Sequence, residues 1–209
     1  MIDSRAFVKY SPTTLADVLR RENVMDFSIR PLWEGMPRVA GEAYTVRCAP
    51  RDNLMLHAAI HRAPAGAVIV VQASDLDYAV AGGNVCALAQ RRGIAAFIID
   101  GLVRDLAEIR ANRFPVFARG VTPIPGGKQV IDVLNNGPVR CGGAKVAPGD
   151  VIVADEEGIV VIHFADKEAV FQAAQIRADQ DAAETLDTWE TAHLRRIDEI
   201  LRAKGFPES

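Results

Sequence analysis

The sequence AAFIIDGLVRD, residues 95–105, carries the strongest indication of how this chain folds. Its apolar run FII predicts a short buried strand that ends at Asp100. Gly101 then permits a tight turn, and Arg104 and Asp105 stand at the start of an amphipathic run, LAEIRAN, which predicts a helix. A strand that leads directly into a helix is the repeating unit of an α/β fold.

The segments on both sides continue this alternation of strands and helices. Residues 41–48 and 67–72 predict strands, and the second (AVIVVQ) is apolar throughout, which favours a central place in a covered sheet. Residues 53–62 and 84–92 have helical periodicity and are followed by proline or glycine. After Pro115, short strands separated by glycine or proline replace this pattern: PVFARGV, PVRCGGAKV, DVIVADE and GIVVIHF. The middle of the chain is therefore β/α and the later part is rich in strands.

The C-terminal region predicts a long amphipathic helical segment. Residues 165–204 contain neither glycine nor proline. Their apolar side is formed by Val170, Ala174, Ile176, Leu186, Trp189, Leu194, Ile197 and Leu201. We expect one α/β domain over residues 1–164 and a helical extension over residues 165–209, which packs on the domain or on a neighbouring subunit.

Composition excludes several classes of protein. The 209 residues are 49% hydrophobic and 24% charged, as in an ordinary globular protein, and the net charge of -3 offers no basic face for nucleic acid. The N-terminus lacks an apolar signal core, and the longest apolar runs are far shorter than the roughly 20 residues that span a membrane. Cys48, Cys86 and Cys141 are widely spaced, which is typical of buried thiols in a reducing compartment. We expect a cytoplasmic protein that has neither a nucleic-acid nor a membrane partner.

Two predicted helices begin at the same edge of the sheet. The helix over residues 84–92 runs antiparallel to the strand that it feeds, so it begins near the end of that strand, where the helix after Arg104 also begins. Free N–H groups and positive dipole ends at two helix starts favour an anion. Ligands also bind at the carboxyl ends of strands in open α/β sheets. Gly82 and Gly83 precede the first helix, and we count both among the substrate-binding residues.

Arg104 and Asp105 have complementary chemistry at this predicted site. The planar guanidinium of Arg104 can bond both oxygens of a carboxylate. Asp105 can hold a hard divalent cation, with water and substrate oxygens completing the shell, as is common for magnesium. Because adjacent helical residues point roughly 100° apart, the two side chains serve one ligand only if it sits over the helix end. The alternative is a surface arginine and a first-turn aspartate that complements the helix dipole.

Two other motifs indicate structure rather than chemistry. His57 and His61 lie four residues apart on one helical face, but the acidic partner of the HExxH metal motif is absent, which favours satisfied or solvent-facing histidines. Residues 124–128 (IPGGK) resemble a phosphate loop, but Gln129 stands where that loop has serine or threonine. We expect a turn at this segment.

Several segments, taken together, resemble the RraA-like family. They are RVAGEAYTVRC, GG followed by NVCALAQRRGIAAFIIDGLVRD, FPVFARGVTP and APGDVIVADEEGIVVI, and they lie within residues 14–162. This family includes the regulator of RNase E activity and aldolases for 4-hydroxy-4-methyl-2-oxoglutarate and 4-carboxy-4-hydroxy-2-oxoadipate. The resemblance implies a three-layer β/β/α fold of the swivelling-domain type, assembled as a homotrimer or as a hexamer (a dimer of trimers), with a site between subunits.

For the aldolases, the resemblance implies a site at Arg104 and Asp105. This pair would bind the pyruvyl group and a Mg²⁺ or Mn²⁺ ion, held by Asp105. Backbone amides after the glycine pair, at Asn84 and Val85, would hold the substrate carboxylate. The cation would polarise the 2-oxo group and stabilise the pyruvate enolate left by carbon–carbon cleavage, and the same effect would allow decarboxylation of oxaloacetate. The implied activity is that of a metal-dependent lyase acting on a small 2-oxo acid.

The chain departs from the aldolase signature at one position. That signature places an acidic residue 21 positions before the arginine, where it bonds water held by the metal, and this chain has Gly83 there. Loss of such a group costs ~10–100-fold in metal affinity or activity. Three carboxylates are candidates to replace it: Asp75, Asp77 and Asp100. The resemblance also implies a second acidic residue from the C-terminal helical region of a neighbouring subunit, for which Asp181 and Glu184 are the candidates.

Two functions are consistent with these features. The intact Arg104–Asp105 pair favours an enzyme, because the regulator-type sequences tend not to keep it. Gly83 favours the alternative, a non-catalytic regulator that inhibits an RNA-processing enzyme through protein contacts. The sequence assigns neither the substrate nor the general base.

Overall fold

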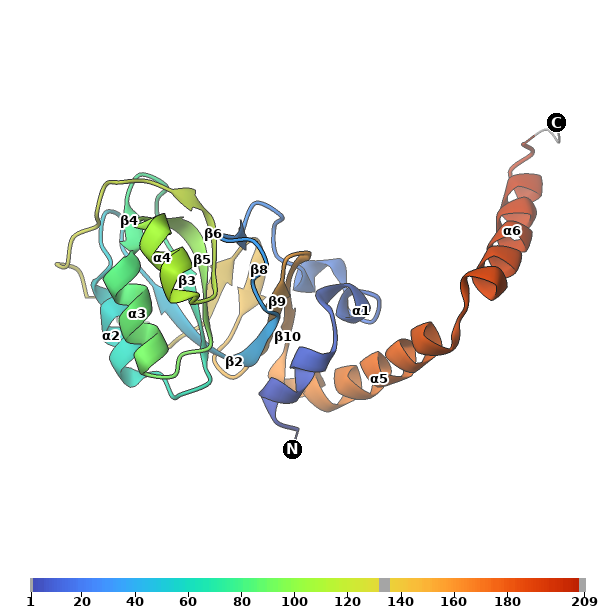
Figure 1. Ribbon diagram of the computed structural model, residues 1–209, viewed down its shortest axis with the longest axis horizontal. Coiled ribbons are helices and arrows are strands. Elements are labelled where there is room, and N and C mark those ends of the chain that lie inside the picture. Colours follow the sequence, from blue (N-terminus) through green and yellow to red (C-terminus); the bar gives the residue numbers. More distant parts are fainter. Residues whose placement is uncertain (1, 132–135, 207–209) are drawn as a thin grey trace.

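The computed structural model describes residues 2–131 and 136–206, which form a body of sheet and helices and a helical arm (Figure 1). The strands are β1 (Arg30–Pro31), β2 (Val39–Arg47), β3 (Val68–Gln72), β4 (Ala79–Ala81), β5 (Ala96–Val103), β6 (Val116–Val121), β7 (Val139–Cys141), β8 (Ala144–Val146), β9 (Val151–Asp155) and β10 (Gly158–Ile162). The helices are α1 (Pro12–Ala16), α2 (Leu54–Arg62), α3 (Gly83–Arg91), α4 (Leu106–Asn112), α5 (Lys167–Ala183) and α6 (Leu186–Ala203). Three short 3₁₀ helices cover Ser4–Lys9, Arg21–Asn23 and Phe164–Asp166.

The main sheet has the strand order β1-β6-β5-β3-β2-β9-β10, with β4 paired to β5. Strands β2, β3, β5 and β6 are parallel, and Ile69 of β3 is in register with Phe97 of β5. The helices α2, α3 and α4 cover one face of this parallel part (Figure 1). Val68–Val71 are fully buried, so the prediction that residues 67–72 form a central covered strand is confirmed.

Two further groups of strands complete the body. The antiparallel hairpin β7–β8 packs its apolar residues into the same core as β3 and β5, including Val139 and Cys141. Strands β9 and β10 extend the sheet in the antiparallel sense beyond β2. A second core lies beneath them, where Phe7, Val153 and Ile162 meet the first turns of α5. The parallel centre and the later region rich in strands both follow the prediction.

Strand β5 is longer than its sequence predicts. The expected turn at Gly101 is wrong, because β5 continues through this residue to Val103. A Cβ atom on Gly101 would lie 2.6 Å from the Cβ of Ala73, so the missing side chain permits close packing on the neighbouring segment. The pairing of β5 with β6 shifts register between Ile99 and Leu102, which marks the same place as an irregularity.

The predicted C-terminal helical region is divided into two helices. Helix α5 ends at Ala183, and Thr185 starts α6 with a capping box that it forms with Thr188. The first half of α5 packs on the body through Val170 and Ala174. Helix α6 has no buried residue within the described chain, and it exposes the large apolar side chains of Leu186, Trp189, Leu194, Ile197 and Ile200. Among the described residues, no helix combines the length and apolarity that crossing a membrane requires.

Candidate functional site

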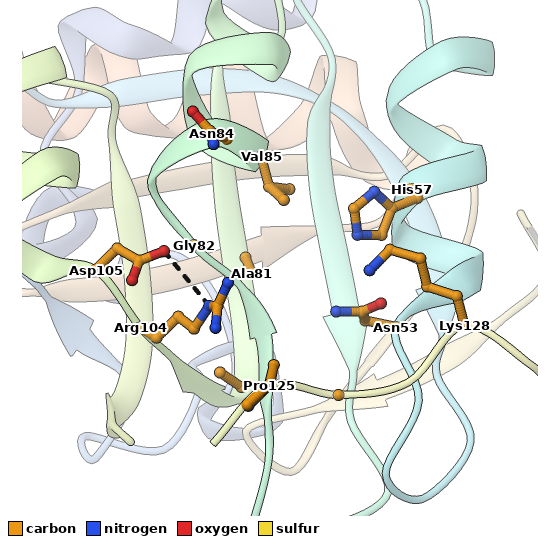
Figure 2. A pocket seen from close by; sticks show the side chains of 12 residues that line it. Asn53, His57, Ala81, Gly82, Asn84, Val85, Arg104, Asp105, Pro125 and Lys128 are labelled. Atoms are coloured by element: carbon orange, nitrogen blue, oxygen red, sulfur yellow. Dashed lines mark ion pairs between the residues drawn. The ribbon is translucent and has the colours of Figure 1, made fainter. Parts of the chain in front are cut away.

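A cavity of about 90 Å³ lies where the parallel strands end and α3 begins. Figure 2 shows two walls, with Arg104 and Asp105 on one side and His57, Asn53 and Lys128 on the other. The full lining is Asn53, His57, Ala79, Ala81, Gly82, Asn84, Val85, Arg104, Asp105, Pro125, Gly126 and Lys128. The position agrees with the strand-end site predicted from the sequence.

Arg104 and Asp105 lie in the connection between β5 and α4, ahead of the helix itself. Arg104 donates its backbone N–H to the carbonyl of Ala81 over 3.0 Å, and Asp105 is the N-cap of α4 in the left-handed conformation, with φ 61°. The 100° separation of adjacent helical residues therefore does not apply to this pair. Arg104 Nε lies 3.4 Å from Asp105 Oδ2, so both side chains serve the same end of the cavity.

The structure brings the two helix starts together as predicted. The backbone N–H of Gly83 donates to Asp105 Oδ2 over 3.1 Å, which joins the start of α3 to that of α4. A Cβ atom on Gly82 would lie 2.5 Å from the same oxygen, so only glycine permits this approach. Asn84 and Val85 line the cavity from the first turn of α3, where backbone N–H groups have no partner within the helix. The site thus combines backbone donors with one guanidinium and one carboxylate.

Gly83 leaves space that another side chain fills. A Cβ atom on Gly83 would lie 1.9 Å from Oε2 and 2.6 Å from Cβ of Glu108, which projects from the first turn of α4. The carboxylate of Glu108 therefore occupies the volume into which a side chain at position 83 would extend. The sequence analysis missed this residue, although its position three residues after Asp105 places it on the same end of α4.

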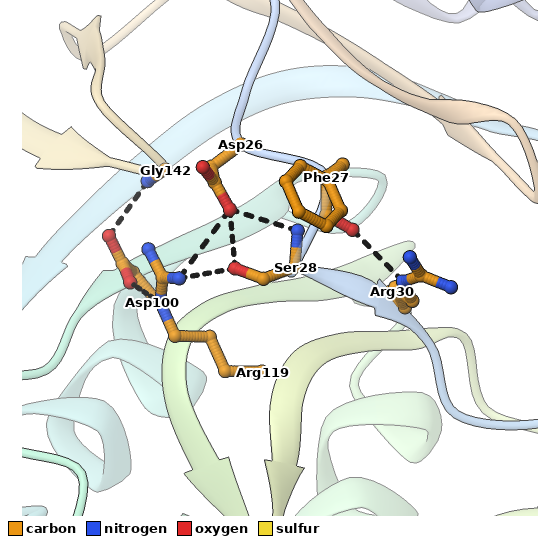
Figure 3. A network of polar contacts seen from close by, with 7 residues as sticks. All are labelled: Asp26, Phe27, Ser28, Arg30, Asp100, Arg119 and Gly142. Atoms are coloured by element: carbon orange, nitrogen blue, oxygen red, sulfur yellow. Dashed lines mark hydrogen bonds and ion pairs between the residues drawn. The ribbon is translucent and has the colours of Figure 1, made fainter.

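The carboxylates proposed from the sequence as replacements lie elsewhere, and the cavity lining includes none of them. Asp100 pairs with Arg119 and accepts from the backbone N–H of Gly142 over 2.7 Å. Figure 3 shows this network, in which Arg119 also contacts Asp26 and Ser28. These contacts tie β5 and β6 to the loop before β1, so Asp100 stabilises the fold.

Asp75 and Asp77 belong to a turn. Asp75 accepts backbone hydrogen bonds from Arg51 over 2.5 Å and from Asp77 over 3.1 Å.

The two candidates for an acidic residue from a neighbouring subunit lie at the end of α5. Asp181 pairs within this helix with Arg177, at 2.7 Å between Nη1 and Oδ1, and Glu184 caps the end of α5.

The second wall was not predicted. His57 Nε2 and Asn53 Oδ1 are buried atoms with no hydrogen-bond partner among the residues that the structure describes. The interpretation of His57 as a satisfied or solvent-facing histidine is therefore wrong. The turn expected at segment 124–128 is wrong, because Pro125 and Gly127 form parallel bridges with Ala79 and Asp52, and this extended segment brings Lys128 to the cavity. Burial lowers the pKa of His57, and the positive charges of Lys128 and His61 lower it further, against an opposing effect of Asp52.

Asp52 explains how this wall is built. It is 4% exposed, and its carboxylate accepts the backbone N–H groups of Leu54 over 2.8 Å, Gln129 over 2.5 Å and Val130 over 3.2 Å. Asn53 donates its backbone N–H to the carbonyl of Gly127 over 2.8 Å. These bonds join two segments far apart in the sequence and fix the strand-end loop beside α2.

The donor set suits a hard cation that keeps most of its water. No group of three or more His, Cys, Asp or Glu side chains that could hold a metal occurs in residues 2–131 and 136–206. Asp105 is the one acidic side chain in the cavity lining that the structure describes. One carboxylate with waters and substrate oxygens is a common arrangement for magnesium, whereas a structural zinc site needs four protein ligands. Asp105 therefore fits the expected Mg²⁺ or Mn²⁺.

The three cysteines are buried, as predicted. Cys86 lies in α3 close to the cavity, and burial, with a smaller effect of the Asp105 charge, raises the pKa of its thiol to about 12. A thiol in this state is not a nucleophile at neutral pH.

Comparisons with known proteins identify the family. The model of the RraA-like family (Aldolase/RraA) matches residues 12–161. A protein of Halalkalibacterium halodurans named "Putative 4-hydroxy-4-methyl-2-oxoglutarate aldolase" is 40% identical over 176 residues, which cover 83% of each chain.

Two solved structures support the same assignment. The RNA-processing inhibitor RraA of Thermus thermophilis has 28% identity and a TM-score of 0.64, over 72% of this chain and 90% of that one. Streptomyces coelicolor RraAS2, described as an unusual member of the RNase ES inhibitor RraA protein family, has 25% identity and a TM-score of 0.77, over 86% and 93%. These matches confirm the α/β fold class with C-terminal helices that the sequence predicts. The chain belongs to the RraA-like family.

Proposed function

We propose that this protein is a divalent-metal-dependent lyase that cleaves a carbon–carbon bond of a 2-oxo acid and releases pyruvate. Retro-aldol cleavage and decarboxylation of oxaloacetate are the two reactions that fit. One observation carries the proposal: Arg104, Asp105 and the start of α3 face a single cavity at the strand ends. Relatives named as aldolases support the same class of reaction.

Arg104 and the start of α3 bind the oxo acid. The backbone N–H groups of Asn84 and Val85 hold the carboxylate at the positive end of the helix dipole. Arg104 is 42% exposed in its side chain, so its guanidinium is accessible to the substrate. Its fixed positive charge lies where negative charge develops on the 2-oxo oxygen during cleavage.

Asp105 holds Mg²⁺ or Mn²⁺ in this proposal. When bound, the cation supplies Lewis-acid polarisation of the 2-oxo group and stabilises enolate charge. The hydrogen bond from Gly83 and the ion pair with Arg104 orient the Asp105 carboxylate. Glu108, next to Gly83, places a second carboxylate near this end of α3. Its carboxylate occupies the volume that a side chain at position 83 would fill, but it is not part of the cavity lining.

We also propose that the protein assembles as a homotrimer or as a hexamer. Helix α6 exposes Trp189, Leu194 and Ile197, and none of its residues is buried within the described chain. A large exposed apolar stripe indicates an interaction surface, and a second copy of this chain is the partner that fits the expected assembly. In that assembly, the C-terminal helices reach a neighbouring subunit.

The second candidate function is a regulator of an RNA-processing enzyme. It is favoured by the fold match to an RNA-processing inhibitor and by the glycine at position 83. A regulator that acts through protein contacts needs neither Arg104 nor a metal at Asp105. The two functions therefore differ in what happens when this pair is removed.

The test is pyruvate release by the purified protein, with Mg²⁺ or Mn²⁺, from oxaloacetate and from 4-hydroxy-4-methyl-2-oxoglutarate. We expect release by the wild type above the rate of the metal alone. Arg104→Ala and Asp105→Asn should lose it, while Arg110→Ala, on the exposed side of α4, should keep it. Release at the metal-only rate by all four proteins, with both substrates, would favour the regulator.

A further inference from the structure

The wall opposite Arg104 and Asp105 holds polar atoms without partners. His57 Nε2 and Asn53 Oδ1 are buried and make no hydrogen bond with any part of the chain that the structure describes. Both line the cavity (Figure 2). Buried polar atoms in proteins are nearly always hydrogen-bonded, so two orphans in one cavity indicate that a polar ligand completes them.

This wall is rigidly built. Asn53 is 6% exposed, and its backbone is fixed by the hydrogen bond to Gly127. The carboxylate of Asp52 accepts the backbone N–H groups of Leu54, at the start of α2, and of Gln129, next to Lys128. The backbone that carries Asn53 and the segment beside Lys128 is therefore held in place before a ligand arrives, as an active site requires.

The chemistry of the lining leaves one candidate for a proton acceptor. The ionisable side chains around the cavity are His57, Arg104, Asp105 and Lys128. Arginine stays protonated in proteins, and Asp105 is assigned to the cation. Two groups act on His57 as positive charges: Lys128, and His61 on the same helix as His57. The negative charge of Asp52 has the opposite effect. Burial and these charges keep the pKa of His57 below its ordinary value, so its imidazole is neutral at neutral pH.

Retro-aldol cleavage needs such an acceptor and decarboxylation does not. In a 4-hydroxy-2-oxo acid, the hydroxyl proton must leave as the bond between C3 and C4 breaks. Oxaloacetate loses carbon dioxide without removal of any hydroxyl proton. A base in this cavity would therefore serve one of the two proposed reactions and not the other.

We propose that His57 is the general base of retro-aldol cleavage and accepts the substrate's 4-hydroxyl proton at Nε2, beside Asn53, which contacts the same end of the substrate. This inference rests on the proposed lyase function. The O–H electron pair forms the carbonyl of the departing product, and the C3–C4 pair forms the enolate of pyruvate. The imidazolium then returns its proton to C3, which gives the methyl group of pyruvate and restores neutral His57. No other reactant is consumed.

The test compares the two reactions in His57→Gln, which keeps a polar side chain of similar reach. Because general acid–base catalysis contributes ~10²–10⁴-fold, kcat for cleavage of 4-hydroxy-4-methyl-2-oxoglutarate should fall by at least ~100-fold. Oxaloacetate decarboxylation should keep its rate within about threefold, since water can protonate the enolate. In the wild type, cleavage should fall as the pH drops and His57 becomes protonated, and the variant should lack this acidic limb.

His61→Gln is the matched control, because His61 lies one turn further along α2 and is not part of the cavity lining. It should keep both reactions, with the acidic limb moved slightly to higher pH because a positive charge near His57 is lost. A second readout needs no aldol substrate. Wild type should exchange the methyl protons of pyruvate with D₂O, and His57→Gln should lose this exchange.

The outcomes separate this inference from the proposed function. If His57→Gln loses cleavage and decarboxylation equally, His57 is not the general base, and the lyase function stands. The same holds if His57→Gln keeps both cleavage and methyl exchange at wild-type rates. A wild type that releases no pyruvate and exchanges no methyl proton would overturn both.

Discussion

The backbone N–H of Gly83 donates a hydrogen bond to Oδ2 of Asp105 over 3.1 Å, and this contact joins the starts of α3 and α4. The same oxygen lies 3.4 Å from Arg104 Nε. One carboxylate thus accepts a backbone donor from one helix start and pairs with the guanidinium just before the other. The cavity, the proposed metal ligand and the oxo-acid site all depend on this junction.

Manganese binding at Asp105 predicts a thermal shift. A ligand at about 100 times its Kd stabilises the folded state by about 2.7 kcal/mol. For a chain of this size, that raises Tm by roughly 5–10 °C. We expect this rise in the wild type and none in Asp105→Asn, which keeps an acceptor for Gly83 but loses the charge. Asp198→Asn on the exposed helix α6 should respond like the wild type, and an equal shift in all three proteins would exclude Asp105 as the ligand.

Close packing at Gly83 predicts a steric penalty. Gly83→Ala should lower the free energy of unfolding by ~1–3 kcal/mol, because its Cβ would overlap Glu108. Gly120→Ala in β6 should change it by less than about 1 kcal/mol, since its Cβ would lie at an ordinary 3.4 Å from Leu102. Urea unfolding measures both, and Glu108→Ala should recover part of the loss at position 83. Equal effects at the two glycines would contradict this packing.

The state of His57 predicts a pH dependence of stability. Its pKa in the folded protein lies below the ordinary value of about 6.5, so the unfolded chain binds more protons at this residue in mildly acidic solution. The stability that neutral His57 contributes is fully present above the unfolded pKa of about 6.5. It is lost as the pH falls from there through the lower pKa of the folded protein. Between pH 7.5 and 5, Tm should fall more steeply in the wild type than in His57→Gln. Parallel curves would show that His57 titrates alike in both states.

The apolar stripe of α6 predicts a dependence of assembly on Trp189 and Leu194. Light scattering after size-exclusion chromatography should give a trimer or a hexamer for the wild type. Leu194→Glu and Trp189→Glu should lower the mass, because a charge placed in an apolar interface loses its water. Arg195→Ala, which removes an exposed charge from the same helix, should not lower the mass. A monomeric wild type at micromolar concentration would contradict the proposed assembly.

The sequence predicted the parts of the site that depend on local order along the chain. The apolar runs predicted β3 and β5 as strands, which the structure pairs in parallel, and the short connection before α4 predicted that Arg104 and Asp105 lie at a strand end. The sequence predicts a turn at Gly101 because a glycine within a strand and one in a turn look alike until the neighbouring Ala73 is known.

The second wall depends on contacts that no local pattern reveals. Lys128 reaches the cavity because Asp52 binds the backbone of Gln129, 77 residues away. Helical periodicity places His57 on one face of α2 but does not show which groups surround that face. The missing partner of its Nε2 atom therefore has no local signal in the sequence. The break between α5 and α6 had a local signal in Thr185 and Thr188, and the apolar pattern that continues on both sides of it concealed this cap.

The most direct test of the site is a crystal structure grown with Mn²⁺ and oxalate, a planar dianion shaped like the enolate of pyruvate. Anomalous scattering from manganese locates the ion without reference to activity. We predict one strong peak beside the carboxylate of Asp105, with oxalate between it, Arg104 and the backbone N–H groups of Asn84 and Val85. Manganese and oxalate bound elsewhere, with this cavity empty, would contradict the account.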